Sequence, residues 1–107
     1  MNIKDVGTCW VKIYLSGPIE QAKQIMRQDC LREGLCVTVE PTTYIYTGGE
    51  EAGYVVGLIN YPRFPTTQAA LDRRAMHLME ILLAGTFQTS ALMMTPEKTT
   101  WVTTREV

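Results

Sequence analysis

The stretch that decides the fold runs from residue 35 to residue 61 and reads LCVTVEPTTYIYTGGEEAGYVVGLINY. Apolar and polar residues alternate on both sides of Gly48-Gly49, which is the pattern of two strands joined by a tight turn. Pro41 has no N–H to donate to a neighbouring strand, so it favours an edge strand or a bulge. The sequence therefore predicts a long antiparallel β-hairpin in the middle of the chain.

Two amphipathic helices are predicted, one on each side of this hairpin. The first covers residues 18–33, where apolar residues recur at spacings of three and four, and Gly34 supplies the left-handed residue that ends it. The second begins at a cap on Thr66 or Thr67 and continues to about Ala84. Its buried stripe is formed by apolar residues at the same spacings.

Further strands are predicted over residues 9–15, 87–94 and 99–104. The order is then strand, helix, hairpin, helix, strand and a terminal strand. Right-handed crossovers arrange this order as an α+β, ferredoxin-like βαββαβ fold with an extra C-terminal strand. Both helices lie on one face of an antiparallel sheet. At 107 residues, the chain has the usual length of a single domain.

The return strand of the hairpin is apolar on both of its faces. Tyr54, Val56 and Leu58 alternate with Val55 and Ile59. Because two helices cover only one face of the sheet, the second apolar face is left without a cover from this chain. We therefore expect a homo-oligomer.

Composition excludes several classes of partner. The net charge of -1, from 10 basic and 11 acidic residues, gives no footprint for nucleic acid or for an anionic membrane. No apolar run reaches the roughly 18 residues that span a bilayer, and the N-terminus lacks the apolar core of a signal peptide, so we expect a cytoplasmic protein. Cys9, Cys30, Cys36 and the lone His77 do not have metal-site spacing. We expect the cysteines to be packing residues, and no cofactor or metal.

Several local runs resemble the CutA divalent-cation-tolerance family, whose relatives in fold include the PII signalling proteins. The runs are residues 16–18, 31–39 and 41–46 and the acidic pair 50–51. The resemblance implies a tight trimer in which long hairpins pair between subunits. The family's His-Pro-Tyr before the fourth strand is here Gly-Thr-Phe at residues 85–87. Its proposed metal-binding histidine is absent, so the resemblance does not imply copper binding.

A shorter run, residues 12–19, resembles the opening strand and loop of nucleoside 2-deoxyribosyltransferase-like proteins. In those enzymes this loop meets the substrate. They have a parallel sheet, whereas the middle of this chain is predicted to be a hairpin. The acidic pair Glu50-Glu51, beside the turn glycines, is interpreted as solvated turn residues.

The connector over residues 61–65 is the best candidate for a ligand site. Two prolines stiffen it, and Arg63 lies between the rings of Tyr61 and Phe64. The connector leads into the positive end of the second helix, where backbone N–H groups near Thr66 and Thr67 are expected to converge with Arg63 on an anion. Aromatic rings beside an arginine suit a nucleotide-like ligand.

In a trimer, Tyr44 and Tyr46 are expected to approach this site from the next subunit and stack on a base. Two function classes follow. The first is a non-catalytic oligomer that binds or sequesters a small anionic or nucleotide-like molecule, as signalling-nucleotide sponges of viral anti-defence systems do. The alternative is a nucleoside-processing enzyme acting on an N-glycosidic or phosphoester bond. A purely structural assembly domain is the third reading, and the scarcity of histidine and clustered carboxylates favours the first.

Overall fold

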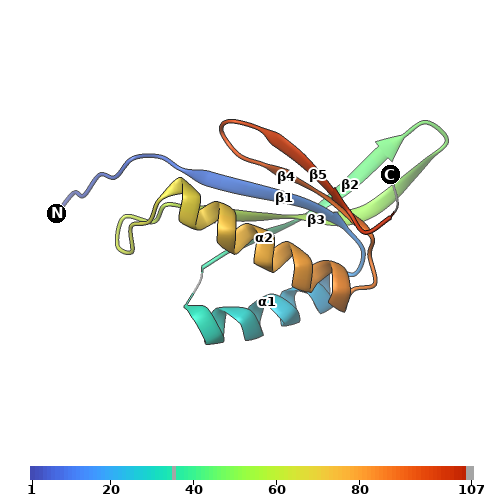
Figure 1. Cartoon of the computed structure of the whole chain (residues 1–107), viewed down its shortest axis with the longest axis horizontal. Coiled ribbons are helices and arrows are strands. Elements are labelled where there is room, and N and C mark those ends of the chain that lie inside the picture. The colour runs from blue at the N-terminus through green and yellow to red at the C-terminus, as the bar shows by residue number, and fades with distance from the viewer. Residues whose placement is uncertain (35, 106–107) are drawn as a thin grey trace.

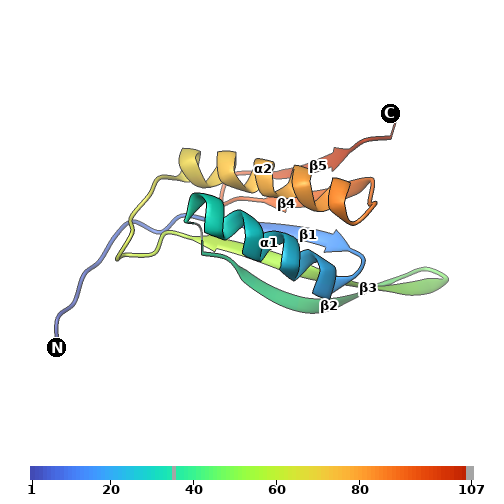
Figure 2. The same ribbon diagram turned by 90° about the horizontal axis from the view of Figure 1, so that it is seen from below.

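The computed structural model describes residues 1–34 and 36–105, and it has the predicted ferredoxin-like α+β architecture (Figure 1). Five antiparallel strands form one sheet in the order β2-β3-β1-β4-β5. Helices α1 and α2 lie side by side on one face of it (Figures 1 and 2). The elements are β1 Trp10–Ser16, α1 Ile19–Glu33, β2 Thr38–Tyr46, β3 Gly49–Ile59, α2 Gln68–Gly85, β4 Ser90–Met94 and β5 Thr99–Thr103.

The core lies between the sheet and the two helices. The central strand β1 points Val11, Ile13 and Leu15 at the helices, as its alternation predicts, and all three are buried. Their partners are the helix-facing residues of β3 and the apolar stripes of the helices: Tyr54, Val56, Leu58, Ala22, Met26, Leu71, Ala75, Leu78, Met79 and Leu82. In the part of the chain that the structure describes, no helix has the length and apolarity to cross a membrane.

Pro41 lies in an edge strand, which was one of its two predicted settings, whereas the predicted start of the fourth strand is wrong. β2 continues through Pro41 without a bulge, because β2 is an edge strand and Pro41 pairs with Tyr54 in unbroken register. The predicted start of this strand at Leu35 lies outside the described residues. β4 starts at Ser90 and not at Phe87, because Phe87 has a φ of 57° and is therefore in the left-handed region, which an extended strand cannot include.

The three cysteines differ in their surroundings. Cys9 is buried and Cys30 is half-buried, as expected for packing residues. Cys36 is exposed, so the prediction that it packs in the core is wrong. It lies just before β2, where the chain has not yet joined the sheet.

Helices α1 and α2 are joined by a polar cluster that the sequence did not reveal. Asp29 of α1 is 6% exposed and accepts a hydrogen bond of 2.7 Å from Nη2 of Arg32. Nε2 of His77, on α2, lies 3.3 Å from the same carboxylate oxygen. Nearby, Nη2 of Arg74 donates to the backbone carbonyl of Glu33 at 2.8 Å, so α2 also binds the end of α1.

The β2–β3 hairpin extends beyond the helices, and the molecule measures 51 × 29 × 28 Å (Figures 1 and 2). At its base, the ring of Tyr44 lies across Gly53, and its hydroxyl donates to the backbone carbonyl of Leu15 at 2.9 Å. A Cβ at Gly53 would lie 2.5 Å from Cε2 of Tyr44 and would also overlap the carbonyl of Leu15. The hairpin therefore meets β1 closely only because residue 53 lacks a side chain.

We expect Gly53→Ala to lower the free energy of unfolding by about 1–3 kcal/mol, because the added methyl group overpacks this contact. The measurement is urea denaturation followed by circular dichroism. Gly7→Ala is the matched control, since a Cβ there meets nothing within 4 Å; its expected effect is within about 0.5 kcal/mol. Equal midpoints for the two variants would contradict the close approach at Gly53.

Candidate functional site: a groove on the open face of the sheet

The face of the sheet opposite α1 and α2 carries a row of large side chains. Val55, Tyr14, Leu92 and Trp101 are register partners on β3, β1, β4 and β5. Direct partners in an antiparallel sheet project from the same face, so the four side chains form a continuous band. Val55, Tyr14 and Leu92 are half-buried and Trp101 is 59% exposed. The predicted uncovered apolar face is thus present in this chain.

A groove of about 290 Å³ crosses this face where β1 ends. Aromatic rings, two serines and one carboxylate share its walls. Strands β1, β2, β3, β4 and β5 all contribute residues to it: Tyr14, Leu15, Ser16, Tyr44, Tyr46, Glu51, Ser90, Ala91, Leu92 and Trp101.

Tyr44 forms a fixed wall of this groove. Its hydroxyl donates to the backbone carbonyl of Leu15. Burial raises the pKa of Tyr44, and the neighbouring Tyr14 and Glu51 raise it further, against the opposing effect of the hydrogen bond to Leu15. Tyr44 is therefore neutral at physiological pH and acts as a hydrogen-bonded aromatic surface.

Glu51 is the acidic group of the groove. It is the register partner of Tyr44, so its carboxylate lies on the same face as that ring. Among the residues that the structure describes, no basic side chain lies within 4.0 Å of Glu51. The interpretation of Glu51 as a turn residue is wrong, because β3 begins at Gly49 and includes it. Pairing the hairpin residue by residue about a turn at Thr47-Gly48 would have placed Glu51 beside Tyr44.

The predicted connector site is formed in part. Tyr61 and Phe64 stack with ring centroids 6.4 Å apart, and the Arg63 guanidinium lies 5.5 Å from the Phe64 ring. Tyr61, Phe64 and Thr66 line a hollow of about 210 Å³. The arginine that lines this hollow with them is Arg74 of α2.

One of the backbone groups expected to bind an anion at this connector already has a partner, and the hydroxyl of Thr67 caps the helix. The N–H of Thr66 donates to Oδ1 of Asn60 at 2.8 Å. Thr67 is the N-cap of α2, and its hydroxyl accepts from the N–H of Ala70 at 3.2 Å. These hydrogen bonds hold the connector in place and leave fewer donors free for a ligand than the sequence suggested.

Within one chain, the connector and the tyrosines of the hairpin lie far apart. Tyr44 and Tyr46 belong to the open-face groove. From Glu51, beside Tyr44, to Ile59, where the connector starts, β3 runs eight residues, or about 27 Å at ~3.4 Å per residue. A shared site for Arg63 and Tyr44 would therefore require a second copy.

The groove suits a flat ligand that carries positive charge. Aromatic faces attract cations, and a carboxylate without a basic partner adds to that attraction. The groove is open to solvent, and its volume of about 290 Å³ is at the lower end of the about 300–1,000 Å³ usual for small-molecule sites. One copy of the chain can thus supply one wall of a binding site.

No family model and no curated protein matches the sequence. Two solved structures share the fold. The first, of a phage SAM lyase in its apo state, aligns with a TM-score of 0.65 and 12% identity over 100% of this chain and 99% of that one. The second, of a phage SAM lyase in complex with S-methyl-5'-thioadenosine, aligns with a TM-score of 0.61 and 11% identity over 96% of this chain and 95% of the other.

Proposed function

We propose that this protein is an enzyme that binds S-adenosylmethionine (SAM) in the open-face groove and cleaves one of its carbon–sulfur bonds. The observation that carries the proposal is Glu51 among Tyr14, Tyr44, Tyr46 and Trp101, on a fold shared with phage SAM lyase. This is the enzymatic alternative of the sequence analysis, with a carbon–sulfur bond in place of an N-glycosidic or phosphoester bond.

The groove offers each part of SAM a chemically matched partner. An adenine ring stacks on exposed aromatic side chains such as Tyr46 and Trp101, which are 56% and 59% exposed. The sulfonium and the α-ammonium group are cations, and Glu51 is the carboxylate lining this groove. Ser16 and Ser90 add hydroxyl groups for the ribose.

The reaction breaks the bond between the sulfonium sulfur and Cγ of the methionine-derived chain. The bonding pair goes to sulfur, which yields neutral S-methyl-5'-thioadenosine. The four-carbon fragment either closes its own carboxylate onto Cγ or loses a Cβ proton to a base and forms a double bond. Both routes balance without water or another co-reactant. A partly apolar groove favours them because the charge on sulfur disappears as the bond breaks.

A second copy of the chain is part of this proposal. The groove is open, and the apolar row of Tyr14, Val55, Leu92 and Trp101 continues beside it. If another copy of the chain covered the groove and this apolar row, water would be excluded from the site. A trimer remains the arrangement that the CutA-like resemblance favours. Such a protein would deplete a methyl donor, which fits a phage protein that acts against host defences.

We expect the purified protein to convert SAM into S-methyl-5'-thioadenosine. The measurement is liquid chromatography of a time course with SAM, with boiled protein as the control. Turnover beyond one equivalent per chain is the decisive result, because a sequestering protein would return SAM intact after denaturation.

Binding of SAM with complete recovery of the nucleoside would contradict the enzymatic proposal and restore the non-catalytic binder. Neither binding nor conversion, in a folded protein, would contradict both. A thermal-shift series with SAM, S-methyl-5'-thioadenosine, ATP and a cyclic dinucleotide separates these outcomes and also tests the predicted anionic ligand.

A further inference from the structure

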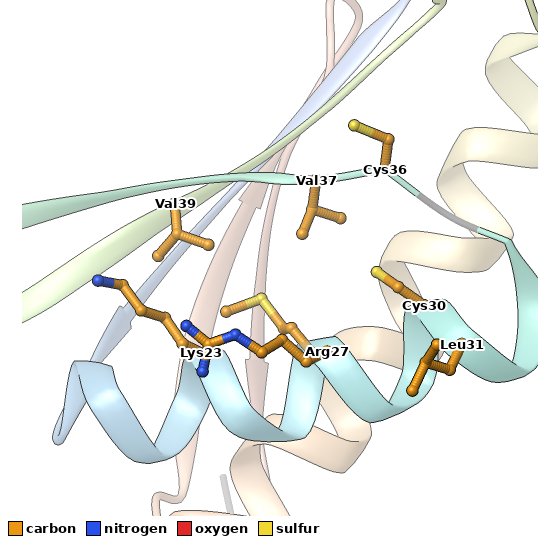
Figure 3. Close-up of a pocket in the computed structure, with 8 residues that line it drawn as sticks. Lys23, Arg27, Cys30, Leu31, Cys36, Val37 and Val39 are labelled. Carbon is orange, nitrogen blue, oxygen red and sulfur yellow. The ribbon is translucent and has the colours of Figure 1, made fainter.

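A second hollow lies between α1 and β2, on the helix side of the sheet. Figure 3 shows Val37, just before β2, and Val39, in β2, facing Arg27 and Cys30 of α1 across it. Its volume is about 690 Å³. Its lining is mainly apolar and consists of Met26, Cys30, Leu31, Cys36, Val37 and Val39, with Lys23 and Arg27 beside them. Among residues 1–34 and 36–105, no side chain fills this space, which we call the α1–β2 groove.

The two basic residues give the α1–β2 groove a positive edge. Lys23 and Arg27 are four residues apart and so lie on successive turns of α1. Nζ of Lys23 pairs with Oε1 of Glu20 at 3.2 Å, whereas Nη1 of Arg27 donates to the neutral amide of Gln24 at 3.2 Å. Within the described residues, Arg27 has no carboxylate within 4.0 Å. The groove therefore suits an apolar group next to a negative charge.

The tip of the β2–β3 hairpin presents that combination. Ile45 and Glu50 are register partners, so their side chains project from the same face of the hairpin. Ile45 is 81% exposed, so its aliphatic side chain is available to another surface. Glu50 is exposed and, among the described residues, has no basic side chain within 4.0 Å. The hairpin carries both beyond the body of the molecule (Figures 1 and 2).

The chain cannot place this hairpin in its own α1–β2 groove. Val39 lines the groove and Ile45 lies six residues further along the same continuous strand. At about 3.3 Å per residue, the two are about 20 Å apart. If a hairpin tip occupies this groove, it must therefore belong to another copy of the chain.

We propose that the hairpin tip of one copy docks in the α1–β2 groove of the next, with Ile45 against Val37, Val39 and Met26 and with Glu50 paired to Arg27. An aliphatic anchor in an apolar pocket with a charge pair at its edge is a common arrangement at protein interfaces. The contact joins two different surfaces, so repeating it builds a ring if its rotation closes and a filament if it does not. It does not depend on the proposed reaction, because the α1–β2 groove is on the face opposite Glu51.

The test is a directed disulfide between copies. One population carries Ile45→Cys together with Cys30→Ser and Cys36→Ser, and the other is the wild-type protein with an isotope label. After mixing and mild oxidation with diamide, we expect a disulfide from position 45 to Cys30 or Cys36 of the labelled copy, identified by mass spectrometry. The same experiment with Lys98→Cys, in the exposed β4–β5 turn, is the matched control.

Absence of this disulfide, or an equal yield from the Lys98→Cys control, overturns the proposal. A groove that binds a small amphiphilic anion instead would give no disulfide and would be stabilised by decanoate in a thermal scan, which also overturns it. SAM cleavage is measured separately in the same samples, so failure of the docking and failure of the proposed function give different results.

Charge reversal provides a second test that leaves the apolar contact in place. We expect Arg27→Glu and Glu50→Arg each to weaken self-association about tenfold or more, since each places like charges together. Combined in one chain, the two changes restore opposite charges and should recover most of the lost association in analytical ultracentrifugation. Additive losses in the double variant would overturn the pairing of Glu50 with Arg27.

Discussion

Glu51→Gln is expected to weaken the binding of SAM by about 10–100-fold while leaving the binding of S-methyl-5'-thioadenosine within about twofold. A charged hydrogen bond contributes on the order of 1.5–3 kcal/mol, which corresponds to this range of affinity. S-methyl-5'-thioadenosine has neither the sulfonium charge nor the ammonium group, so it has no cation to lose from Glu51. The measurement is isothermal titration calorimetry with both ligands, with SAM cleavage followed in parallel.

The control for Glu51→Gln is Glu97→Gln. Glu97 is an exposed acid in the turn between β4 and β5, outside the open-face groove, so the same loss of charge there should leave both affinities unchanged. Equal weakening of both ligands by Glu51→Gln would indicate damage to the groove in general. Unchanged SAM binding would remove Glu51 from the proposed site.

Asp29→Ala is expected to lower the free energy of unfolding by about 2–3 kcal/mol. The side chain of Asp29 is 5% exposed and holds Arg32 and His77 between α1 and α2, so its loss removes contacts that join the two helices. Hydrogen bonds to charged groups contribute about 1.5–3 kcal/mol each, and the exposure of Arg32 and His77 reduces the combined value. The measurement is urea denaturation at pH 7.

Glu20→Ala is the matched control for Asp29→Ala. Glu20 forms an ion pair with Lys23 at the same spacing of three residues on the same helix, but its side chain is 78% exposed. We expect this change to cost under about 1 kcal/mol. Equal losses from the two variants would show that burial of Asp29 is not what makes its ion pair strong.

The contribution of Asp29 should depend on pH. Burial acts to raise the pKa of Asp29, but the hydrogen bonds and charges of Arg32 and His77 outweigh it and hold that pKa below its ordinary value of 3.8. A group with a lowered pKa in the folded state stabilises the protein above its unfolded pKa and loses this effect as the pH falls through the folded pKa. The difference in the free energy of unfolding between wild type and Asp29→Ala should thus have its largest value above about pH 4–5 and shrink below pH 3.8.

The order of helices and strands could be predicted from the sequence because it depends on local patterns. Alternation in β1 and in the β2–β3 hairpin, the three-and-four spacing of the helices, and Gly34 as the end of α1 are properties of a few consecutive residues. The same alternation predicted that β3 is apolar on both faces. Glycine and proline marked most of the turns, and Thr67 was one of the two predicted caps for α2.

The grouping of side chains into sites was decided by tertiary structure. Glu51 lies beside Tyr44 because of the hairpin register. It shares a groove with Tyr14, Ser90 and Trp101 because the strand order places β1, β4 and β5 next to β3 in one sheet. Asp29 meets His77, 48 residues away, because the two helices pack on the same face. Arg63 and Tyr44 were predicted to meet one ligand only across two subunits, and the length of β3 does keep them apart in a single chain.

What the sequence determined by itself was therefore the fold and the presence of an uncovered apolar face. These follow from periodicity, which each segment carries in its own residues. Strand order decided that Glu51 is the carboxylate among the aromatic rings of the open-face groove. Helix packing decided that a groove stays open between α1 and β2. Those features depend on distances between residues far apart in the chain, and a local pattern does not contain such distances.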